Sequence, residues 1–343
     1  MSKVTLRYIA EKTGVHPSTV SRALDPARAS LVHPGTRELV QTVADSLGYR
    51  PNALASGLRR GRTNTFGVVV VDLGNPFVAP VIRGIENNLE SRGFMALIAE
   101  TQDEPARLGR ALDHLRSRKV DAIITTAARA GDEAVLRRVG RTIPTVLAVR
   151  HLAGSGLPAV THDDTLGGRL AAEHLISLGC RSLAQLPGPV AISSFVDRGA
   201  GFGAAAERHG TRVLPVGDHA ARPDIPEGER LMELLLAAAG DEPPDGVFAH
   251  NDQMAIGALA ALRRRGLRCP EDVRLIGYND SPLTAYTAPP LSTIRLPGYE
   301  LGRIAGEVAV SLIEDPTRTV PPLSLPPVLV PRASSTGLAP DPG

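Results

Sequence analysis

The sequence predicts an α/β protein that carries a small all-α domain at its N-terminus. Between residues 5 and 47, apolar residues recur at helical spacing. From Thr65 onward, short apolar strands alternate with helices, which is the rhythm of doubly wound parallel sheets. The charge divides at the same place. Residues 1–62 carry ten Lys/Arg and four Asp/Glu, a net charge of +6, whereas the whole chain has +2 and the remainder therefore −4.

Residues 5–25 have the pattern of two short helices joined by a tight turn. Thr5 is a favourable N-cap, Gly14 can adopt the left-handed conformation that the turn needs, and Pro17 suits the first turn of the second helix. The apolar residues lie on one face of each helix: Leu6, Ile9 and Ala10, then Val20, Ala23 and Leu24. This arrangement predicts a helix-turn-helix.

A third helix is expected over residues 36–47, with Leu39, Val40, Val43 and Leu47 inward and Gly48 ending it. The alternative to a DNA-reading motif is an ordinary helical hairpin of a globular domain. The net charge of +6 favours DNA, because Lys and Arg neutralise phosphates. We therefore expect a DNA-binding domain over residues 1–50.

Residues 51–63 are expected to form a hinge helix and linker, the helix running from Pro51 or Asn52 to about Leu58. Helices shorter than ~12–15 residues are marginal alone in water. We therefore expect this helix to fold only when two hinges meet on DNA. The alternative is a plain linker with an exposed Leu, but the neighbouring Arg59, Arg60 and Arg62 favour a DNA groove.

The region from residue 64 contains two sets of strands and helices. The first set has strands at 66–71, 95–100, 122–126 and 145–149, with helices at 78–92, 105–117 and 132–139. The second has strands at 158–162, 182–186, 212–216, 246–250 and 273–278, with helices at 167–178, 198–209, 228–239 and 253–265. Two sets of similar length predict two similar lobes. Ligands of such sheets bind outside the carboxyl ends of strands, so we expect a ligand in the cleft between lobes.

The same rhythm also fits a nucleotide-binding enzyme. No GxxxxGK[ST], no GxGxxG after a strand, no GxSxG and no HExxH is present. The trio His162-Asp163-Asp164 is more typical of a helix cap than of a metal site. We therefore expect no catalytic residues, no metal and no cofactor.

Composition limits the environment in which the chain works. No run of ~18 apolar residues and no signal-peptide pattern is present. We therefore expect a cytoplasmic protein that does not associate with a membrane. Cys180 and Cys269 form no CxxC and are expected to be free thiols. The tail, RASSTGLAPDPG, has no leucine heptad, so no tail-mediated tetramer is expected. It is expected to be disordered, with residues 337–343 outside the core.

The N-terminal stretches TLRYIAEKTGVHPSTVSRAL and GYRPNALASGLRRGRTNTFGVVV closely resemble the LacI/GalR family of transcriptional regulators. The resemblance continues through NPF at 75–77, HDDTLGGRLAAEHLISLG, DRGAGF at 197–202, HNDQMAIGALAALRRRGLRCPEDVRLIGYND and PPLSTIR at 289–295. It implies a periplasmic-binding-protein-like core over residues 64–336. Lobe 1 would hold about 64–160 plus 295–320, and lobe 2 about 161–292 plus 321–336, with residues 323–330 as one strand of lobe 2.

The second helix would present its N-terminal end to base edges, and its hydroxyls would suit phosphates. The resemblance also implies that Leu58 is a wedge in the minor groove, with Asn52 and Ala55 on the groove side. The expected DNA-binding residues are Thr5, Pro17, Ser18, Thr19, Ser21, Arg22, Thr36, Tyr49, Asn52, Ala55 and Leu58. The sequence departs from the family pattern at Tyr8, at His16 and in the insertion-like residues 25–35. These departures leave the capping of the helices open.

The resemblance places the effector-binding residues around the cleft: Phe77, Arg150, Ser194, Arg198, His219, Asn251, Asp252, Asn279 and Asp280. An Arg fork such as Arg198 can bind two hydroxyls or a carboxylate at once. For Phe77, a place in the hydrophobic core is as good an explanation as effector binding. For Asn251 and Asp252, the alternative to effector binding is that they cap a helix. Val149 departs from the family, whose members commonly carry Asp there, so one acceptor for sugar hydroxyls is missing.

These observations together predict a cytoplasmic, sequence-specific DNA-binding transcriptional regulator, a repressor. As a homodimer it would read a pseudo-palindromic double-stranded operator. A small-molecule effector, expected to be a sugar, would bind between the lobes. The alternatives are a purine-type corepressor-dependent regulator, a ligand-binding transport receptor and an α/β enzyme. The absence of a signal-peptide pattern and the net charge of +6 over residues 1–62 argue against a transport receptor. No motif favours an enzyme.

Overall fold

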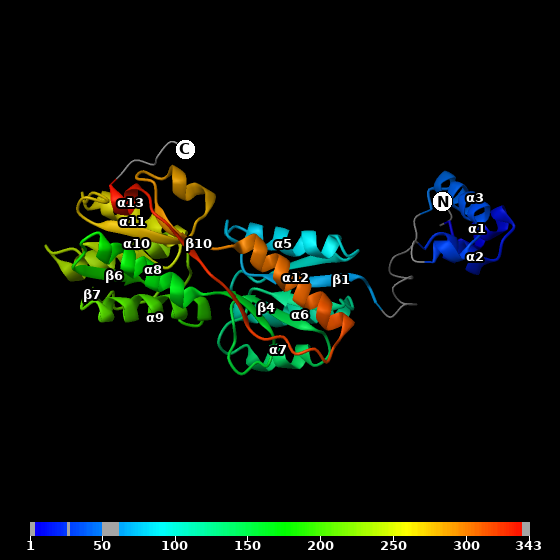
Figure 1. The fold of residues 1–343 in the computed structure, drawn as a ribbon, viewed down its shortest axis with the longest axis horizontal. Coiled ribbons are helices and arrows are strands. Elements are labelled where there is room, and N and C mark those ends of the chain that lie inside the picture. Colours follow the sequence, from blue (N-terminus) through cyan, green and yellow to red (C-terminus); the bar gives the residue numbers. More distant parts are fainter. Residues whose placement is uncertain (1–3, 26–27, 50–61, 338–343) are drawn as a thin grey trace. The chain divides into compact units, whose positions relative to one another are not determined.

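The structure, a computed structural model, describes residues 4–25, 28–49 and 62–337. Contacts divide the chain into two compact units, residues 1–63 and 64–343 (Figure 1). The expected hinge helix, with Asn52, Ala55 and Leu58, and residues 338–343 of the tail lie outside the described residues. No described helix is long and apolar enough to span a membrane.

The N-terminal unit is a three-helix domain, as expected. It contains α1 (Leu6–Thr13), α2 (Pro17–Ala23), a short 3-10 helix η1 (Ala29–Leu31) and α3 (Pro34–Ser46). Ile9, Val20 and Val40, one from each α-helix, are fully buried against one another. This core holds the three helices together.

The helix ends show how the turn is built. Thr5 caps α1 by accepting a hydrogen bond from the Tyr8 amide at 3.3 Å. Gly14 has φ 68°, which a residue with a side chain rarely adopts. His16 caps α2, since its Nδ1 accepts from the Ser18 amide at 3.2 Å. The departure from the family pattern at position 16 therefore leaves the start of α2 capped.

One core expectation in α3 was wrong. Leu39 was predicted to point inward but is 47% exposed. The buried residues are Val40 and Ala44, which lie four residues apart on one helix face. Leu39 precedes Val40 by about 100° around the helix and therefore points away from α1 and α2.

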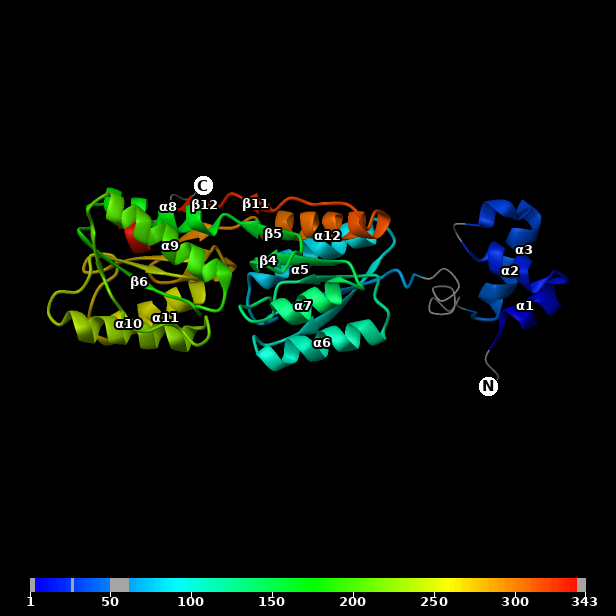
Figure 2. The ribbon, with the colours of Figure 1, turned by 90° about the horizontal axis from the view of Figure 1, so that it is seen from below.

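The larger unit holds two six-stranded sheets among the described residues (Figures 1 and 2). The first sheet has the order β11-β5-β4-β3-β1-β2, and all its neighbours pair in parallel. Its strands are β1 (Thr65–Val70), β2 (Met95–Glu100), β3 (Ala122–Thr125), β4 (Thr145–Val149), β5 (Ala159–His162) and β11 (Leu323–Leu325). Its helices are α5 (Val78–Glu90), α6 (Pro105–Ser117), α7 (Glu133–Gly140) and α12 (Gly298–Glu314).

The second sheet has the order β12-β10-β9-β8-β6-β7 and is parallel except for the β10–β12 pair. Its strands are β6 (Ser182–Leu186), β7 (Arg212–Leu214), β8 (Gly246–Ala249), β9 (Arg274–Asn279), β10 (Ser292–Arg295) and β12 (Val328–Val330). Its helices are α8 (Asp164–Ser177), α9 (Ser193–Arg208), α10 (Ile225–Ala239), α11 (Asp252–Arg264), the 3-10 helix η2 (Pro282–Tyr286) and α13 (Ala333–Thr336).

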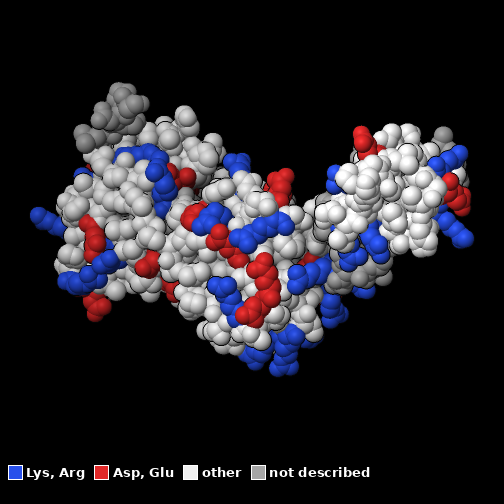
Figure 3. Space-filling model, turned by 45° about the vertical axis from the view of Figure 1, so that its right-hand side comes forward, with Lys and Arg blue, Asp and Glu red and all other residues white. Residues whose placement is uncertain are grey.

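Each lobe has helices on both faces of its sheet, and Figure 2 shows these layers edge on. In the first lobe, alternate residues of β1 pack to opposite sides. Phe66 and Val68 pack with α5 and α12, whereas Val69 packs with α6 and α7. In the second lobe, α8 and α9 cover one face and α10 and α11 the other. On the face seen in Figure 3, basic and acidic side chains are interspersed over this unit.

Two expectations about strand membership were wrong. Residues 158–162 were expected to open the second lobe, but β5 pairs with β4 and β11 in the first sheet. Residues 323–330 were expected to form one strand of the second lobe, but they form β11 in the first sheet and β12 in the second. Pro326 and Pro327 separate these two strands, because proline has no N–H for a sheet ladder.

The chain therefore passes between the described lobes after β5, after β10 and after β11. The Asp163 amide donates to the Leu325 carbonyl at 2.9 Å and ties two of these crossings together. The expected disorder of the tail was wrong for its first residues. α13 buries Ser334 and Ser335 completely, and Ser334 Oγ donates to the Leu275 carbonyl at 2.7 Å.

Candidate functional site

The described DNA-binding candidates all lie in the N-terminal unit, and none of them is buried. Ser18 and Arg22 are exposed on α2, four residues apart, on the side away from the buried Val20. Thr5, Pro17, Thr19, Ser21, Thr36 and Tyr49 are half-buried or exposed. The second helix thus presents polar and basic side chains outward while its apolar face holds the domain together.

A cleft of about 390 Å³ lies between the two lobes of the larger unit. Residues that follow the carboxyl ends of strands in both sheets line it, as expected for parallel α/β folds. The lining residues include Val71, Asp72, Asn75, Phe77, Gln102, Asp103, Thr126, Val149 and Arg150 from the first lobe. Those from the second include Ser194, Phe195, Arg198, Arg222, Pro223, Asp224, Asn251, Gln253 and Asn279.

Arg198 is the most firmly held of these side chains. Its Nε donates to Asp164 Oδ1 at 2.8 Å, and its Nη1 donates to the His250 carbonyl at 2.7 Å. The Tyr278 ring lies 3.8 Å from the guanidinium carbon, and the Tyr278 hydroxyl donates to the same Asp164 oxygen. The guanidinium is therefore fixed at the wall of the cleft by hydrogen bonds from Nε and Nη1.

Burial opposes the charged form of Arg198, but Asp164 and Tyr278 together outweigh burial and raise the pKa of the guanidinium. The cation is thus preorganised and permanently charged. From the sequence, Asp164 was expected to do no more than cap a helix. Its neighbour Asp163 provides that cap, accepting from the Leu166 amide at 2.8 Å, and Asp164 turns inward toward Arg198.

Arg150 is buried and held differently. Its Nη1 donates to Asp103 Oδ1 at 3.1 Å and to the Ala128 carbonyl at 3.3 Å. The preceding Val149 has φ 68°, and the Arg150 amide donates to the Ala148 carbonyl at 2.7 Å, so the chain makes a three-residue turn. A β-branched residue rarely adopts this conformation, so strain is stored at the edge of the cleft.

Six of the nine predicted effector residues line the cleft: Phe77, Arg150, Ser194, Arg198, Asn251 and Asn279. Phe77 also packs against the cores of both lobes, so its position fits the core role as well as the predicted effector contact. Asn251 is also a cap: its Oδ1 accepts from the Met254 amide and its Nδ2 donates to the Pro223 carbonyl, both at 2.7 Å.

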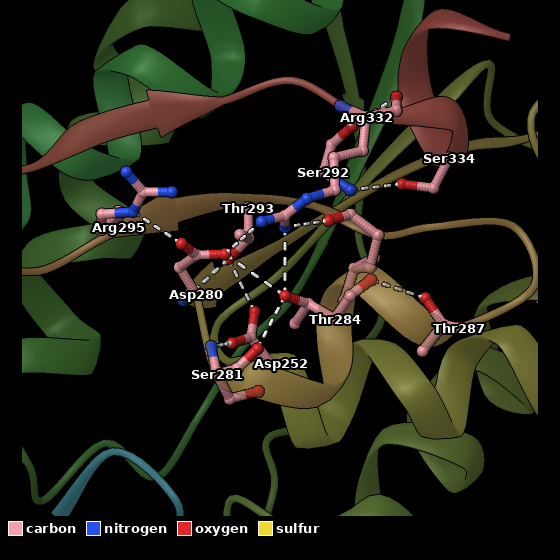
Figure 4. A network of polar contacts seen from close by, with 11 residues as sticks. Asp252, Asp280, Ser281, Thr284, Thr287, Ser292, Thr293, Arg295, Arg332 and Ser334 are labelled. Carbon is pink, nitrogen blue, oxygen red and sulfur yellow. Dashed lines mark hydrogen bonds and ion pairs between the residues drawn. The ribbon is translucent and has the colours of Figure 1, made fainter. Parts of the chain in front are cut away.

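The other three predicted residues do not line the cleft. His219 lies at a separate hollow of the second lobe, with Val213 and Phe195. Asp252 and Asp280 belong to the polar network in Figure 4. Asp252 accepts from the Ser281 amide at 2.7 Å and from the Thr293 hydroxyl at 2.6 Å. It is buried, and burial raises its pKa to about 6.

Asp280 is held between two arginines of the same network. It accepts from Arg332 at 2.7 Å and from Arg295 at 2.6 Å. The pairs Asn251–Asp252 and Asn279–Asp280 are therefore alike, because in each pair only the asparagine lines the cleft. Asn251 and Asn279 face the cleft, whereas Asp252 and Asp280 fasten α11, β9, β10 and the C-terminal segment to one another (Figure 4).

His162 lies beneath the cleft and is 4% exposed. Its ring packs edge-on against Phe77, with 5.7 Å between ring centroids. Neither ring nitrogen has a hydrogen-bond partner among the described residues. Burial, with a smaller contribution from Arg198, lowers its pKa to about 3. In the described part of the chain, no three His, Cys, Asp or Glu side chains are grouped as metal ligands.

Comparisons with known proteins agree with this architecture. Residues 5–52 match the family described as bacterial regulatory proteins, lacI family, and residues 172–335 match the periplasmic binding protein-like domain. The ribose operon repressor of Escherichia coli (strain K12) is 30% identical over 335 residues, 96% of this chain and 99% of that protein. The HTH-type transcriptional repressor CytR of the same strain is 32% identical over 304 residues, 88% of this chain and 87% of that protein.

Two solved structures extend the likeness to the whole fold. The lac repressor dimer bound to operator and the anti-inducer ONPF has a TM-score of 0.87 at 25% identity, covering 97% of this chain and 99% of that chain. The complex of the transcriptional regulator CelR with cellobiose has a TM-score of 0.73 at 30% identity, covering 96% and 99%. The chain therefore belongs to the lacI family of bacterial regulatory proteins: it is a helix-turn-helix transcriptional repressor with a periplasmic-binding-protein-like effector unit, and not an enzyme.

Proposed function

We propose that this repressor acts in the cytoplasm and that a small carbohydrate bound in the inter-lobe cleft controls its affinity for operator DNA. The observation that carries this proposal is the cleft itself. It is lined from both lobes and contains two buried guanidiniums held by hydrogen bonds, those of Arg150 and Arg198. A ligand that contacts both lobes binds one relative arrangement of them better than another, and that difference in affinity drives the change.

The DNA-contacting surface in this proposal is the outer side of α2. Ser18 and Arg22 read base edges, with Pro17 at the helix start, while Thr19 and Ser21 contact phosphates. The DNA contacts next to α2 come from Thr5, Thr36 and Tyr49. The minor groove is contacted by Asn52, Ala55 and Leu58. The lac repressor relative, solved as a dimer on its operator, supports this geometry.

The effector in this proposal is a sugar, contacted by Phe77, Arg150, Ser194, Arg198, Asn251 and Asn279. An aromatic ring beside fixed polar groups suits a sugar, which has apolar C–H faces and hydroxyl edges. The names of the relatives support the class: one represses a ribose operon, and another was solved with cellobiose. The Phe77 ring could also stack on a purine, so the names of the relatives, and not the ring, favour a sugar over the purine-type corepressor.

The functional form in this proposal is a homodimer on a pseudo-palindromic operator. β2 is the outermost strand of the first sheet and exposes Met95 at 72% and Ile98 at 37%. Leu283 and Tyr286 of η2 are also exposed. Unpaired apolar edges are interaction surfaces or aggregation hazards, and a second copy of the chain would cover them.

The test replaces Arg198. Removing it alone would leave Asp164 as an uncompensated buried charge, so we pair Arg198→Gln with Asp164→Asn. The expected result is normal DNA affinity without ligand and no change of that affinity with any sugar. Arg208→Gln, at the exposed end of the same helix α9, serves as the control and should respond normally. A normal response of the double variant would remove Arg198 from the effector site.

A further inference from the structure

The side chain of His16 holds Ser18 at the start of α2. Its Nδ1 accepts a hydrogen bond from the Ser18 amide at 3.2 Å and lies 2.8 Å from the Ser18 hydroxyl oxygen. Pro17, the first residue of the helix, has no N–H, so the Ser18 amide is the first donor of α2 that needs a partner. The His16 carbonyl in turn accepts from the Thr19 amide at 2.8 Å. One exposed imidazole therefore contacts both the amide and the hydroxyl of Ser18.

These two contacts determine where the protons lie. An amide N–H only donates, so Nδ1 of His16 must offer its lone pair and carries no proton in this arrangement. The Ser18 hydroxyl has one proton and two lone pairs, so it forms the 2.8 Å contact by donating its proton to Nδ1. Beside a neutral His16, the exposed Ser18 oxygen therefore presents only lone pairs to its surroundings.

A proton on Nδ1 of His16 reverses this arrangement. In the imidazolium both ring nitrogens are donors. Nδ1 then donates to the Ser18 oxygen, the Ser18 amide loses its acceptor, and the hydroxyl proton is released to point outward. Ser18 thus changes from an acceptor into a donor, and α2 loses its side-chain cap. Histidine is the side chain whose charge ordinarily changes between about pH 5 and pH 8.

Among the described ionisable side chains around α2, the pH range of histidine belongs to His16 and His33. The helix packs against α1, η1 and α3. Lysine, arginine, tyrosine, aspartate and glutamate ordinarily keep one charge state between about pH 5.5 and pH 8. Within the described residues, both hydrogen bonds of the His16 ring are with Ser18. The other ionisable side chains of these elements and their ends are Arg7, Tyr8, Glu11, Lys12, Arg22, Asp25, Arg28, His33, Arg37, Glu38 and Asp45.

The major groove of DNA distinguishes bases by the same polarity. Adenine and cytosine present an amino donor there, at N6 and N4, whereas guanine and thymine present a carbonyl acceptor, at O6 and O4. Ser18 is exposed on the outer side of α2, on the same side as Arg22. An acceptor at position 18 therefore suits an amino base, and a donor suits a carbonyl base.

We propose that His16 is a positioning residue that sets the sequence preference of Ser18. Neutral His16 makes Ser18 select an amino base, adenine or cytosine, and protonated His16 makes it select a carbonyl base, guanine or thymine. This inference rests on the proposed function, because it concerns the same surface of α2. Acidification therefore changes which operator sequence the chain prefers. A helix cap without this role would change the affinity for every sequence by the same factor.

The first experiment finds the base pair that Ser18 contacts. The full chain selects duplexes from random DNA at about pH 8, and Ser18→Ala shows at which position of the selected sites the preference is lost. Dissociation constants are then measured for the four duplexes that differ at this base pair alone, at about pH 8 and about pH 5.5.

Exchanging the amino and carbonyl bases between the strands should weaken binding about 3- to 10-fold at the higher pH and strengthen it by a similar factor at the lower pH, since one hydrogen bond contributes that much. The same order of the four duplexes at both pH values would overturn the proposal. So would a preference that Ser18→Ala leaves intact at every position.

The second experiment replaces the two histidines. The amide oxygen of Asn accepts from the Ser18 amide and hydroxyl as Nδ1 does, but it takes up no proton in this pH range. His16→Asn should therefore keep the preference of the higher pH at both pH values. His33 has the matched position, the N-cap of α3, and makes no side-chain cap hydrogen bond there. His33→Asn should reverse its preference as the parent chain does. A reversal that persists in His16→Asn, or is lost in His33→Asn, would contradict the assignment.

This inference and the proposed function fail in different ways. If acid weakens or strengthens binding to all four duplexes by one factor, His16 acts only as a cap or as a charge near phosphates. In that case the inference falls and the proposed function stands. If the chain selects no duplex at either pH, the proposed function itself fails.

Discussion

At the scale of single residues, His162 and Asp252 are buried ionisable groups whose pKa values move in opposite directions. His162 has its pKa lowered to about 3, mainly by burial, from an ordinary value of 6.5. Asp252 has its pKa raised from 3.8 to about 6, also by burial. The folded chain therefore resists a positive charge beneath the cleft and a negative charge within the network of Figure 4. Stability should depend on pH through both groups.

The His162 contribution is lost as the pH falls from 6.5 toward 3, because the unfolded chain gains a proton there that the folded chain does not. Between pH 7 and pH 5 this amounts to about 2 kcal/mol of unfolding free energy. His162→Phe should remove that loss, since neither ring nitrogen has a partner to give up. Urea unfolding at the two pH values measures it. An unchanged pH difference in the variant would contradict the assignment.

The Asp252 contribution has the opposite sign. Its stabilisation is complete below pH 3.8 and is lost as the pH rises through about 6. Between pH 4 and pH 7 the loss is about 2 kcal/mol. In Asp252→Asn this loss should vanish, and the variant's stability is shifted by a constant amount, because the amide has one acceptor oxygen where the carboxylate has two. If parent and variant show the same stability difference between these pH values, Asp252 does not titrate as described.

Residue-scale prediction from sequence succeeded where a rule of the fold applies. The rule that polar residues after a buried strand face the cleft applied to Asn251, and the family resemblance indicated Asn279; both line the cleft. Neither the rule nor the resemblance could distinguish each from the next residue in the chain, because neighbouring side chains leave a strand in different directions. Asp103 also follows a strand end, but nothing in the local pattern shows that Arg129 and Arg150 hold it in the cleft.

At the scale of helices and strands, three helix pairs approach closely through glycines contributed by both partners. A Cβ on Gly84 of α5 would lie 2.0 Å from the Tyr299 carbonyl oxygen of α12, and one on Gly302 of α12 would lie 2.1 Å from that of Val81. The same exchange joins α8 to α9 through Gly168 and Gly201, and α10 to α11 through Gly228 and Gly257. Backbone contact therefore fixes these pairs, and any side chain there would force them apart.

Two glycines of α9 make this testable within one helix. Gly201→Ala would place its Cβ 2.0 Å from the Thr165 carbonyl oxygen, and we expect it to cost about 1–3 kcal/mol through overpacking. Gly203→Ala meets nothing within 4 Å and should stabilise the helix by about 0.5–1 kcal/mol. Denaturant unfolding of both variants measures the contrast. Equal effects would show that α8 and α9 can separate without cost.

Prediction at this scale succeeded for element types and failed for sheet membership. Strands 95–100 and 182–186 match the expected bounds, because apolar runs between turns mark them directly. The partner of β5 and the division between β11 and β12 could not be found in this way. Pairing depends on which residues meet across the fold, and a three-residue strand carries no pattern that identifies its neighbour.

At the scale of the whole molecule, the proposed homodimer would couple the DNA-reading unit to the effector unit. If the edge strand β2 forms the contact, Met95→Glu should give a monomer in sedimentation velocity, because it places a charge on an apolar edge. Sugar binding should persist, since one chain contains the entire cleft. Val213→Glu, on the edge strand β7 of the second sheet, is the control. Dissociation by Val213→Glu but not by Met95→Glu would place the interface elsewhere.

Control of DNA affinity by a ligand in the cleft is the central proposal. The measurement is the dissociation constant of the full chain for a duplex that it has selected from random DNA, with and without saturating amounts of a sugar that raises its melting temperature. The proposal predicts a change of about 5- to 150-fold, the range of ordinary allosteric coupling. The same dissociation constant with and without that sugar would contradict it, because a ligand that binds but leaves DNA affinity unchanged has no control over the repressor.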